Sequence, residues 1–290
     1  MDTRNKSGHD ELSAGDKSLA LYRSGSKDGP YQPRSRWVTS LSGRYVDFDD
    51  DQINADRDGS LWYVTSALGY RFTDTTTAGV FTRYREGEVD SVALASSLDS
   101  ELWGGGVYLA TTSAGGLRFV GAALFEMGEN DITISGATGD FDSETITLEA
   151  SLDKRITRGR TWIEPQLSFL YHKSDNDDFT DSAGNFVLGE TIVLGRVSFG
   201  PRIGTTLGGG TRAEIKPFAK VNGIWDFERD DTVTASTGAL LKTGETALNL
   251  GGGVDIVFVN SLALRVAGDW FTYDTALEGW SISAQIRAEF

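Results

Sequence analysis

The 290-residue sequence has no cysteine, only two histidines (His9 and His172) and five prolines. These absences exclude cysteine nucleophiles, iron–sulfur clusters and structural zinc, which need cysteine or clustered histidine ligands. The few prolines and the lack of a Gly-X-Y period exclude collagen, and 11 % aromatic residues argue against disorder. We therefore expect no metal site and no cofactor.

Long hydrophobic runs are also missing. The longest apolar stretches, around Val254–Val259 and Phe119–Phe125, are far shorter than the roughly 18 residues that a membrane helix needs. Polar residues follow Met1, so we expect no signal peptide here and, for an exported protein, a mature form or a fragment. A net charge of −15 argues against nucleic acid as a partner, because backbone binding needs a basic face.

Alternation of apolar and polar residues with a period of two runs through the chain instead. The pattern is clearest at the end, where the apolar members are Trp280, Ile282, Ala284, Ile286, Ala288 and Phe290. Similar stretches predict twelve strands, near 37–46, 60–72, 76–88, 100–112, 116–129, 143–156, 160–173, 190–204, 211–226, 245–258, 261–274 and 278–290. At about 11–15 residues they are roughly twice as long as soluble strands and long enough to cross a membrane.

The connections between these strands alternate in length. Short turns are predicted at 73–75, 113–115, 157–159, 205–210 and 260, and longer polar loops at 47–59, 87–99, 130–142, 174–189 and 227–244. This arrangement is typical of an outer-membrane barrel with its long loops outside. Aromatic residues near strand ends fit an interfacial girdle: Trp37, Trp62, Phe72, Tyr84, Tyr171, Trp225, Trp270, Tyr273 and Trp280. We predict an all-β, twelve-stranded antiparallel transmembrane β-barrel; a soluble sandwich or lipocalin-like barrel is the alternative.

The polar face of the predicted strands carries many charges, which are our candidates for the pore lining. They are Arg44, Arg71, Arg83, Arg85, Arg118, Glu126, Glu149, Asp153, Glu164, Arg196, Arg202, Glu214, Lys216, Lys220, Arg265, Asp269 and Arg287. One interpretation is a set of paired, hydrated charges that hold the barrel together; the other is a hydrophilic path that contacts a helix or a translocating chain. Phe81, Trp162 and Phe218 fall on the same face, which indicates either packing against a segment in the lumen or an error in register.

Evidence for catalysis is weak, and we predict no catalytic residue. His172 lies near Asp175, but a histidine at a strand end that enters a polar loop is the favoured interpretation, and neither a Gly-x-Ser-x-Gly nor a Gly-Asp-Ser-Leu motif occurs. Acidic residues crowd three predicted outer loops, at 47–58, 175–181 and 226–231. They indicate solvated loops or, alternatively, weak binding of divalent cations at the lipopolysaccharide surface.

Four motifs resemble the translocator domains of autotransporters, the C-terminal barrels of type V secretion. They are Trp162–Tyr171 with its Glu-Pro-Gln, Leu68–Phe72 followed by Ala78–Phe81, Lys216–Lys220 running into Trp225–Phe227, and the terminal Ile286–Phe290. The last resembles the aromatic-ended signal that the outer-membrane insertion machinery reads. The resemblance covers roughly residues 36–290.

The resemblance implies a pore with an N-terminal helix in its lumen and a covalently linked passenger upstream. We therefore expect two parts, a linker or pore helix at 1–35 (with a weak helical pattern at 10–23) and a barrel at 36–290. The implied function is to anchor and export the passenger across the bacterial outer membrane. The implied partners are membrane lipid, lipopolysaccharide and the insertion machinery. The alternative function is a stand-alone barrel acting as a passive pore for small solutes, and a barrel enzyme ranks third.

Overall fold

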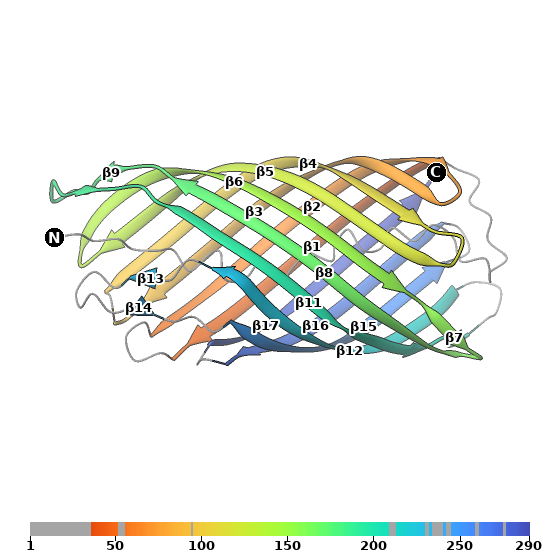
Figure 1. The fold of residues 1–290 in the computed structure, drawn as a ribbon. Coiled ribbons are helices and arrows are strands. Elements are labelled where there is room, and N and C mark those ends of the chain that lie inside the picture. Colours follow the sequence, from red (N-terminus) through yellow and green to blue (C-terminus); the bar gives the residue numbers. More distant parts are fainter. Residues whose placement is uncertain are drawn as a thin grey trace.

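The computed structural model describes residues 36–51, 56–93, 95–208, 213–229, 232–233, 240–241, 245–258, 261–274 and 277–290. In this part of the chain, twelve long antiparallel strands close into one barrel and run steeply inclined to its axis (Figure 1). They are β1 (Trp37–Asp50), β2 (Arg57–Thr73), β3 (Thr76–Ser91), β4 (Ser96–Thr112), β5 (Leu117–Ile134), β6 (Ala137–Lys154), β8 (Thr161–Asn176), β11 (Thr191–Thr205), β12 (Ala213–Arg229), β15 (Thr246–Phe258), β16 (Leu262–Tyr273) and β17 (Leu277–Glu289). The predicted segment 1–35 and its helical pattern lie outside the described residues.

Each long strand pairs with the next one along the chain, and the first pairs with the last. β1 meets β17 over thirteen residue pairs, from Val38↔Glu289 to Asp50↔Leu277. Five short strands add to the barrel: β7 (Ile156–Arg158) continues β6 beside β8, β9 (Phe179–Thr180) pairs with β10 (Phe186–Val187), and β13 (Thr232–Val233) pairs with β14 (Leu240–Leu241). The prediction of a closed twelve-stranded antiparallel barrel is confirmed. The described ranges contain no helix with the length and hydropathy of a membrane span.

The apolar face of the strands lies outside. Along three strands the exposed apolar band spans ten residue steps, Trp62 to Phe72, Leu117 to Met127 and Trp280 to Phe290, and on β12 it spans twelve, Ile215 to Phe227. Ten steps of about 3.3 Å at a tilt of about 40° give a band roughly 25 Å tall, which is the height of the lipid-facing band of outer-membrane barrels. A soluble barrel or sandwich would bury these side chains, so the membrane alternative holds.

The described residues form no single apolar core inside the barrel. Buried apolar side chains form two small clusters on the inner face: Val46, Phe48, Leu61, Tyr63, Val89, Phe271, Tyr273 and Leu277 in one, and Val38, Ala67, Phe81, Tyr108, Ala110, Val120 and Leu124 in the other. Tyr273, predicted in the aromatic girdle, is thus an inner residue, 5 % exposed. Charged and polar side chains occupy the rest of the inner face.

Two of the predicted long loops are largely strand. β5 runs on to Ile134 and β6 begins at Ala137, so residues 130–142 form a hairpin whose turn has positive φ at Ser135 (50°) and Gly136 (88°). Such a turn matches the twist of the two strands. Residues 87–99 likewise lie mostly in β3 and β4. The prediction was wrong because the outer face of a strand beyond the membrane meets water and need not be apolar.

The two ends of the barrel differ. The C-terminus and the short turns lie at one end, whereas β9, β13 and β14 lie at the other (Figure 1). In outer-membrane barrels the short turns face the periplasm. We therefore call the end with the C-terminus the periplasmic end and the opposite end the outer end.

Candidate functional site in the barrel lumen

The seventeen predicted pore-lining residues are all buried or partly buried, while the exposed apolar side chains of the same strands lie at alternate positions. On β3, for example, Arg83 and Arg85 are buried and Val80 is 57 % exposed. Because strand side chains alternate between two faces, the charges point to the lumen. Whether they line a transport path stays a prediction.

A row of alternating cations and carboxylates crosses one side of the lumen toward the periplasmic end. Glu164 on β8 accepts hydrogen bonds from Arg155 Nε and from an Nη of Arg202, each at 2.7 Å. Asp255 on β15 lies 3.7 Å from the other Nη of Arg202 and accepts a bond of 2.6 Å from Arg265 Nε. The ion pairs of this row therefore connect β8, β11, β15 and β16 on the lumen side.

Two aromatic rings complete this row. The guanidinium carbons of Arg155 and Arg202 lie 3.9 and 5.1 Å from the ring centre of Trp162. Those of Arg202 and Arg265 lie 4.7 and 5.7 Å from the ring centre of Phe218. Trp162 and Phe218 therefore face inward because they stack with cations, and the alternative of a register error is wrong.

Most other inner charges also bind one another. The pairs are Arg118–Asp153 (Nε to both oxygens, 2.8 and 2.7 Å), Lys220–Asp269 (2.6 Å), Arg71–Glu289 (2.9 Å), Arg287–Glu289 (2.5 Å), Arg83–Glu149 (4.0 Å), Lys216–Glu214 (2.7 Å), Arg196–Asp226 (2.6 Å) and Arg57–Asp50 (2.7 Å). Arg44 donates to the Ser281 hydroxyl at 3.0 Å and to the Tyr63 hydroxyl at 3.4 Å. Such pairing offsets part of the cost of placing charge inside a barrel wall.

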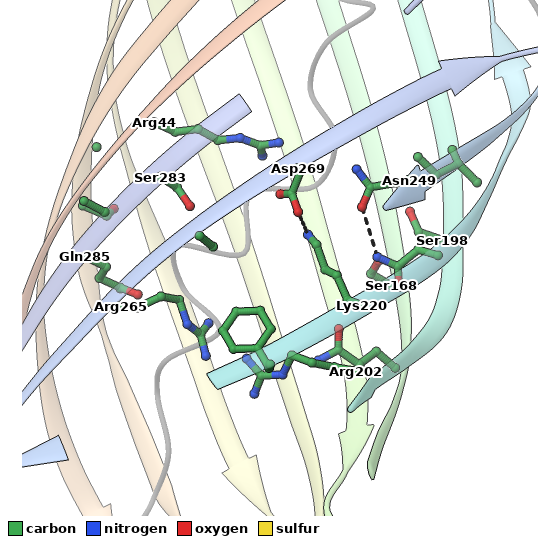
Figure 2. A pocket seen from close by; sticks show the side chains of 18 of the residues that line it. Arg44, Ser168, Ser198, Arg202, Lys220, Asn249, Arg265, Asp269, Ser283 and Gln285 are labelled. Carbon is green, nitrogen blue, oxygen red and sulfur yellow. Dashed lines mark hydrogen bonds and ion pairs between the residues drawn. The ribbon is translucent and has the colours of Figure 1, made fainter. Parts of the chain in front are cut away.

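A cavity of about 90 Å³ lies among these groups. Of the residues that the structure describes, five cations line it, Arg44, Arg118, Arg202, Lys220 and Arg265, against one carboxylate, Asp269. Figure 2 shows all of these side chains except Arg118 by label. The cavity is therefore polar and cationic, although the whole chain is strongly acidic.

Many outer-membrane barrels have a lipid-facing outer surface and a charged lumen, so these features do not identify the family. Comparison of the chain with known protein families does. The model of the autotransporter beta-domain family matches residues 37–269. The chain belongs to this family. It is the translocator barrel of an autotransporter, located in the outer membrane, and the family implies a linked passenger.

Solved translocator barrels share the fold. The translocator domain of NalP from Neisseria meningitidis is 13 % identical, with a TM-score of 0.73 over 88 % of this chain and 89 % of that chain. The beta domain of the Bordetella autotransporter BrkA is 17 % identical, with a TM-score of 0.74 over 88 % and 100 %. The transport unit of AIDA-I from Escherichia coli is 14 % identical, with a TM-score of 0.64 over 94 % and 95 %. A search of curated proteins gave no match.

Several lumen charges of this translocator barrel, the pair Arg57 and Asp50 among them, were missed by the sequence prediction, and three others show why. Arg155 follows Asp153 by two residues and so shares its face, but it lies next to a predicted turn. Asp255 interrupts an apolar run, which is the signal for an inner charge. Asp226, assigned to an acidic outer loop, is 3 % exposed and bound to Arg196.

The histidine-based enzyme alternative does not hold. His172 is buried on the inner face, and its Nδ1 lies 2.9 Å from the hydroxyl of Thr147. Asp175 lies on the opposite face, where it accepts bonds from Lys173 and Thr191, each at 2.6 Å. The alternation of the strand therefore separates the two side chains.

The acidic outer residues show mutual repulsion. Burial, followed by the neighbouring Asp51, Asp58 and Asp56, raises the pKa of Asp49. Among the described residues, no three acidic, histidine or cysteine side chains are grouped as metal ligands. Binding of divalent cations there stays a prediction.

Proposed function

We propose that this translocator barrel exports a passenger joined to its N-terminal side, with residues 1–35 passing through the lumen as the connection between the two. The observation that supports the proposal is the charged inner face, whose cavity lies inside a barrel of a family that carries passengers. A hydrophilic lumen wall can form hydrogen bonds with the backbone of a passing chain. An apolar wall would leave the amides of that chain without hydrogen-bond partners.

The finer roles follow from the two faces of the barrel. The outer band contacts membrane lipid, and the outer end contacts lipopolysaccharide. The insertion machinery recognises the terminal strand through its outward residues; Trp280, Ile282 and Ile286 are 41–51 % exposed, and Phe290 is 63 % exposed. The barrel catalyses no covalent reaction. Its part in transport is to hold the passing chain in the lumen.

A reporter passenger tests the export proposal. An export signal and a small folded reporter are joined in front of residue 1, and protease is added to intact cells. We expect cleavage of the reporter at the surface and a heat-modifiable barrel in the outer-membrane fraction. A reporter that stays protected in the periplasm beside a correctly inserted barrel would contradict export and favour the passive pore.

A further inference from the structure

Three exposed cations lie on the hairpin that joins β6 to β8 at the periplasmic end of the barrel. They are Lys154 at the end of β6, Arg158 at the end of β7 and Arg160 in the turn that follows. None of these side chains forms an ion pair or a hydrogen bond with another described residue. The β2–β3 and β4–β5 turns at the same end contain no lysine or arginine. We call the three cations the basic hairpin.

The basic hairpin borders the lipid-facing surface. Lys154 lies opposite Leu117 on β5, and Ile156 lies opposite Ile163 on β8. The three apolar side chains are 39–53 % exposed. Arg158 follows Ile156 by two residues and therefore points to the same outward side of the wall. The cations thus lie at the periplasmic edge of an apolar surface that continues the lipid-facing band.

The acidic residues of the surrounding strands do not neutralise this edge. In the periplasmic halves of β5, β6, β8 and β11 they are Glu149, Asp153 and Glu164, and each of them faces the lumen, where it is paired with an arginine. The exposed carboxylates of β6, such as Asp140 and Asp142, lie at its outer end. On this side of the barrel, the outward surface is therefore basic at the periplasmic end and acidic at the outer end.

We propose that the basic hairpin binds the headgroup of an anionic phospholipid in the periplasmic leaflet, with the acyl chains on the apolar surface around Ile156. The phosphodiester oxygens accept charge-assisted hydrogen bonds from Arg158 and Arg160. Lys154 lies among apolar side chains, so its stem packs on them while its ammonium group extends to the headgroup. A zwitterionic phospholipid fits less well, because its own ammonium group is repelled by the three cations.

The site is on the outside of the wall, so its test does not depend on a passenger. The full chain is purified in detergent, its folding is checked by the heat-dependent gel shift, and phosphatidylglycerol or the zwitterionic phosphatidylethanolamine is added to the micelles. Native mass spectrometry then counts the lipid molecules that the barrel retains. We expect retention of phosphatidylglycerol at a concentration about thirtyfold lower than that of phosphatidylethanolamine. Equal retention of the two lipids would overturn the proposal.

Substitutions locate the site. Lys154→Gln, Arg158→Gln and Arg160→Gln should each weaken the retention of phosphatidylglycerol about threefold, and the triple variant should lose the preference for it. All three side chains are exposed, so the variants should fold. The control is Arg36→Gln, an exposed cation at the same end but on the opposite side of the barrel, whose Nη1 donates to the Tyr70 hydroxyl at 3.0 Å. An equal loss in the control, or an unchanged preference in the triple variant, would contradict the assignment.

Two further arms distinguish a lipid from free phosphate. Inorganic phosphate, added at an ionic strength held constant with sodium chloride, should not displace phosphatidylglycerol, because it lacks the acyl chains. Ile156→Ser should weaken retention of phosphatidylglycerol, since it removes apolar surface beside the cations. Displacement by inorganic phosphate, or full retention in Ile156→Ser, would replace the lipid site with a surface that binds phosphate groups in general.

Discussion

At the scale of single residues, the barrel wall depends on aromatic rings that cover glycines of neighbouring strands. A Cβ atom on Gly106 would lie 2.5 Å from the Phe81 ring, and one on Gly204 would lie 2.3 Å from the Trp162 ring. The inward rings of Phe81 and Trp162 thus lie directly against neighbouring backbone. Glycine at these positions provides room for the ring, which is why a chain so rich in glycine still forms regular strands.

Two adjacent glycines of β4 give a matched test of this packing. Gly106→Ala should destabilise the barrel by about 1–3 kcal/mol, because the new methyl group would also lie 2.3 Å from the Ala123 carbonyl oxygen. Gly105→Ala should be neutral or slightly stabilising, since its nearest atom lies at 3.6 Å and alanine reduces the freedom of the unfolded chain. The measurement is urea unfolding in detergent, followed by the gel shift of the folded barrel. Equal losses in both variants would contradict the packing argument.

At the scale of elements, the hairpin of β5 and β6 extends beyond the membrane, and the loop after β8 covers the edge of β6. The Asp177 and Ser182 amides donate to the carbonyls of Asp142 and Thr138 at 2.9 and 2.7 Å. The Phe179 ring stacks on Phe141, with 5.4 Å between ring centres. The loop thereby pairs backbone groups of an edge that would otherwise be open to other chains.

Asp181 fixes this loop. Its carboxylate accepts bonds from the Asn185 side chain at 2.8 Å and from the Asn185 and Ala183 amides at 2.8 and 2.9 Å. These bonds lower the pKa of Asp181, the Asn185 side chain most of all. A carboxyl with a lowered pKa stabilises the fold above its unfolded pKa, about 3.9, and this contribution is lost as the pH falls through the folded value.

We expect Asp181→Ala to speed amide hydrogen exchange at Ala183 and Asn185 severalfold at neutral pH, without a change in the barrel strands. In the unaltered chain the same amides should lose their protection on acidification below about pH 4. Asp140→Ala is the control and should change neither, because Asp140 is an exposed carboxylate on β6, in the hairpin that the loop covers. Unchanged exchange in Asp181→Ala would show that the backbone alone holds the loop.

How far the sequence predicts these elements depends on where they lie. Inside the membrane, one face must be apolar, so alternation identified all twelve strands. Outside it, this requirement ends, and the upper parts of β3, β4, β5 and β6 were therefore taken for loops. The contacts of Asp181 could not be predicted either, because they depend on where the loop returns to the β6 edge.

At the scale of the whole molecule, barrel closure brings together charges that are remote in sequence. Arg71 and Glu289 pair across β1, and Arg196 meets Asp226 and Tyr273. The faces of these residues follow from the alternation. Their partners do not, because pairing depends on the stagger between strands, which the local sequence does not specify.

The lumen charges lead to a prediction for the whole barrel. If residues 1–35 pass through the lumen, their deletion should raise the ion conductance of the barrel in a planar bilayer severalfold. The control is the full chain with Arg57→Gln, a paired cation at the outer end, which should conduct like the unaltered chain. Equal conductance with and without residues 1–35 would contradict the proposed path of this segment.

The height of the apolar band has a consequence for membrane sorting. The ten-step spans on β2, β5 and β17 give these sides of the barrel a hydrophobic thickness of about 25 Å. This thickness fits the thin outer membrane, whereas a bilayer core of about 30 Å would leave a mismatch of several ångströms on these sides. Because the three strands lie on different sides of the barrel, tilting the barrel cannot correct the mismatch on all of them at once. Its hydrophobic thickness therefore favours residence in the outer membrane.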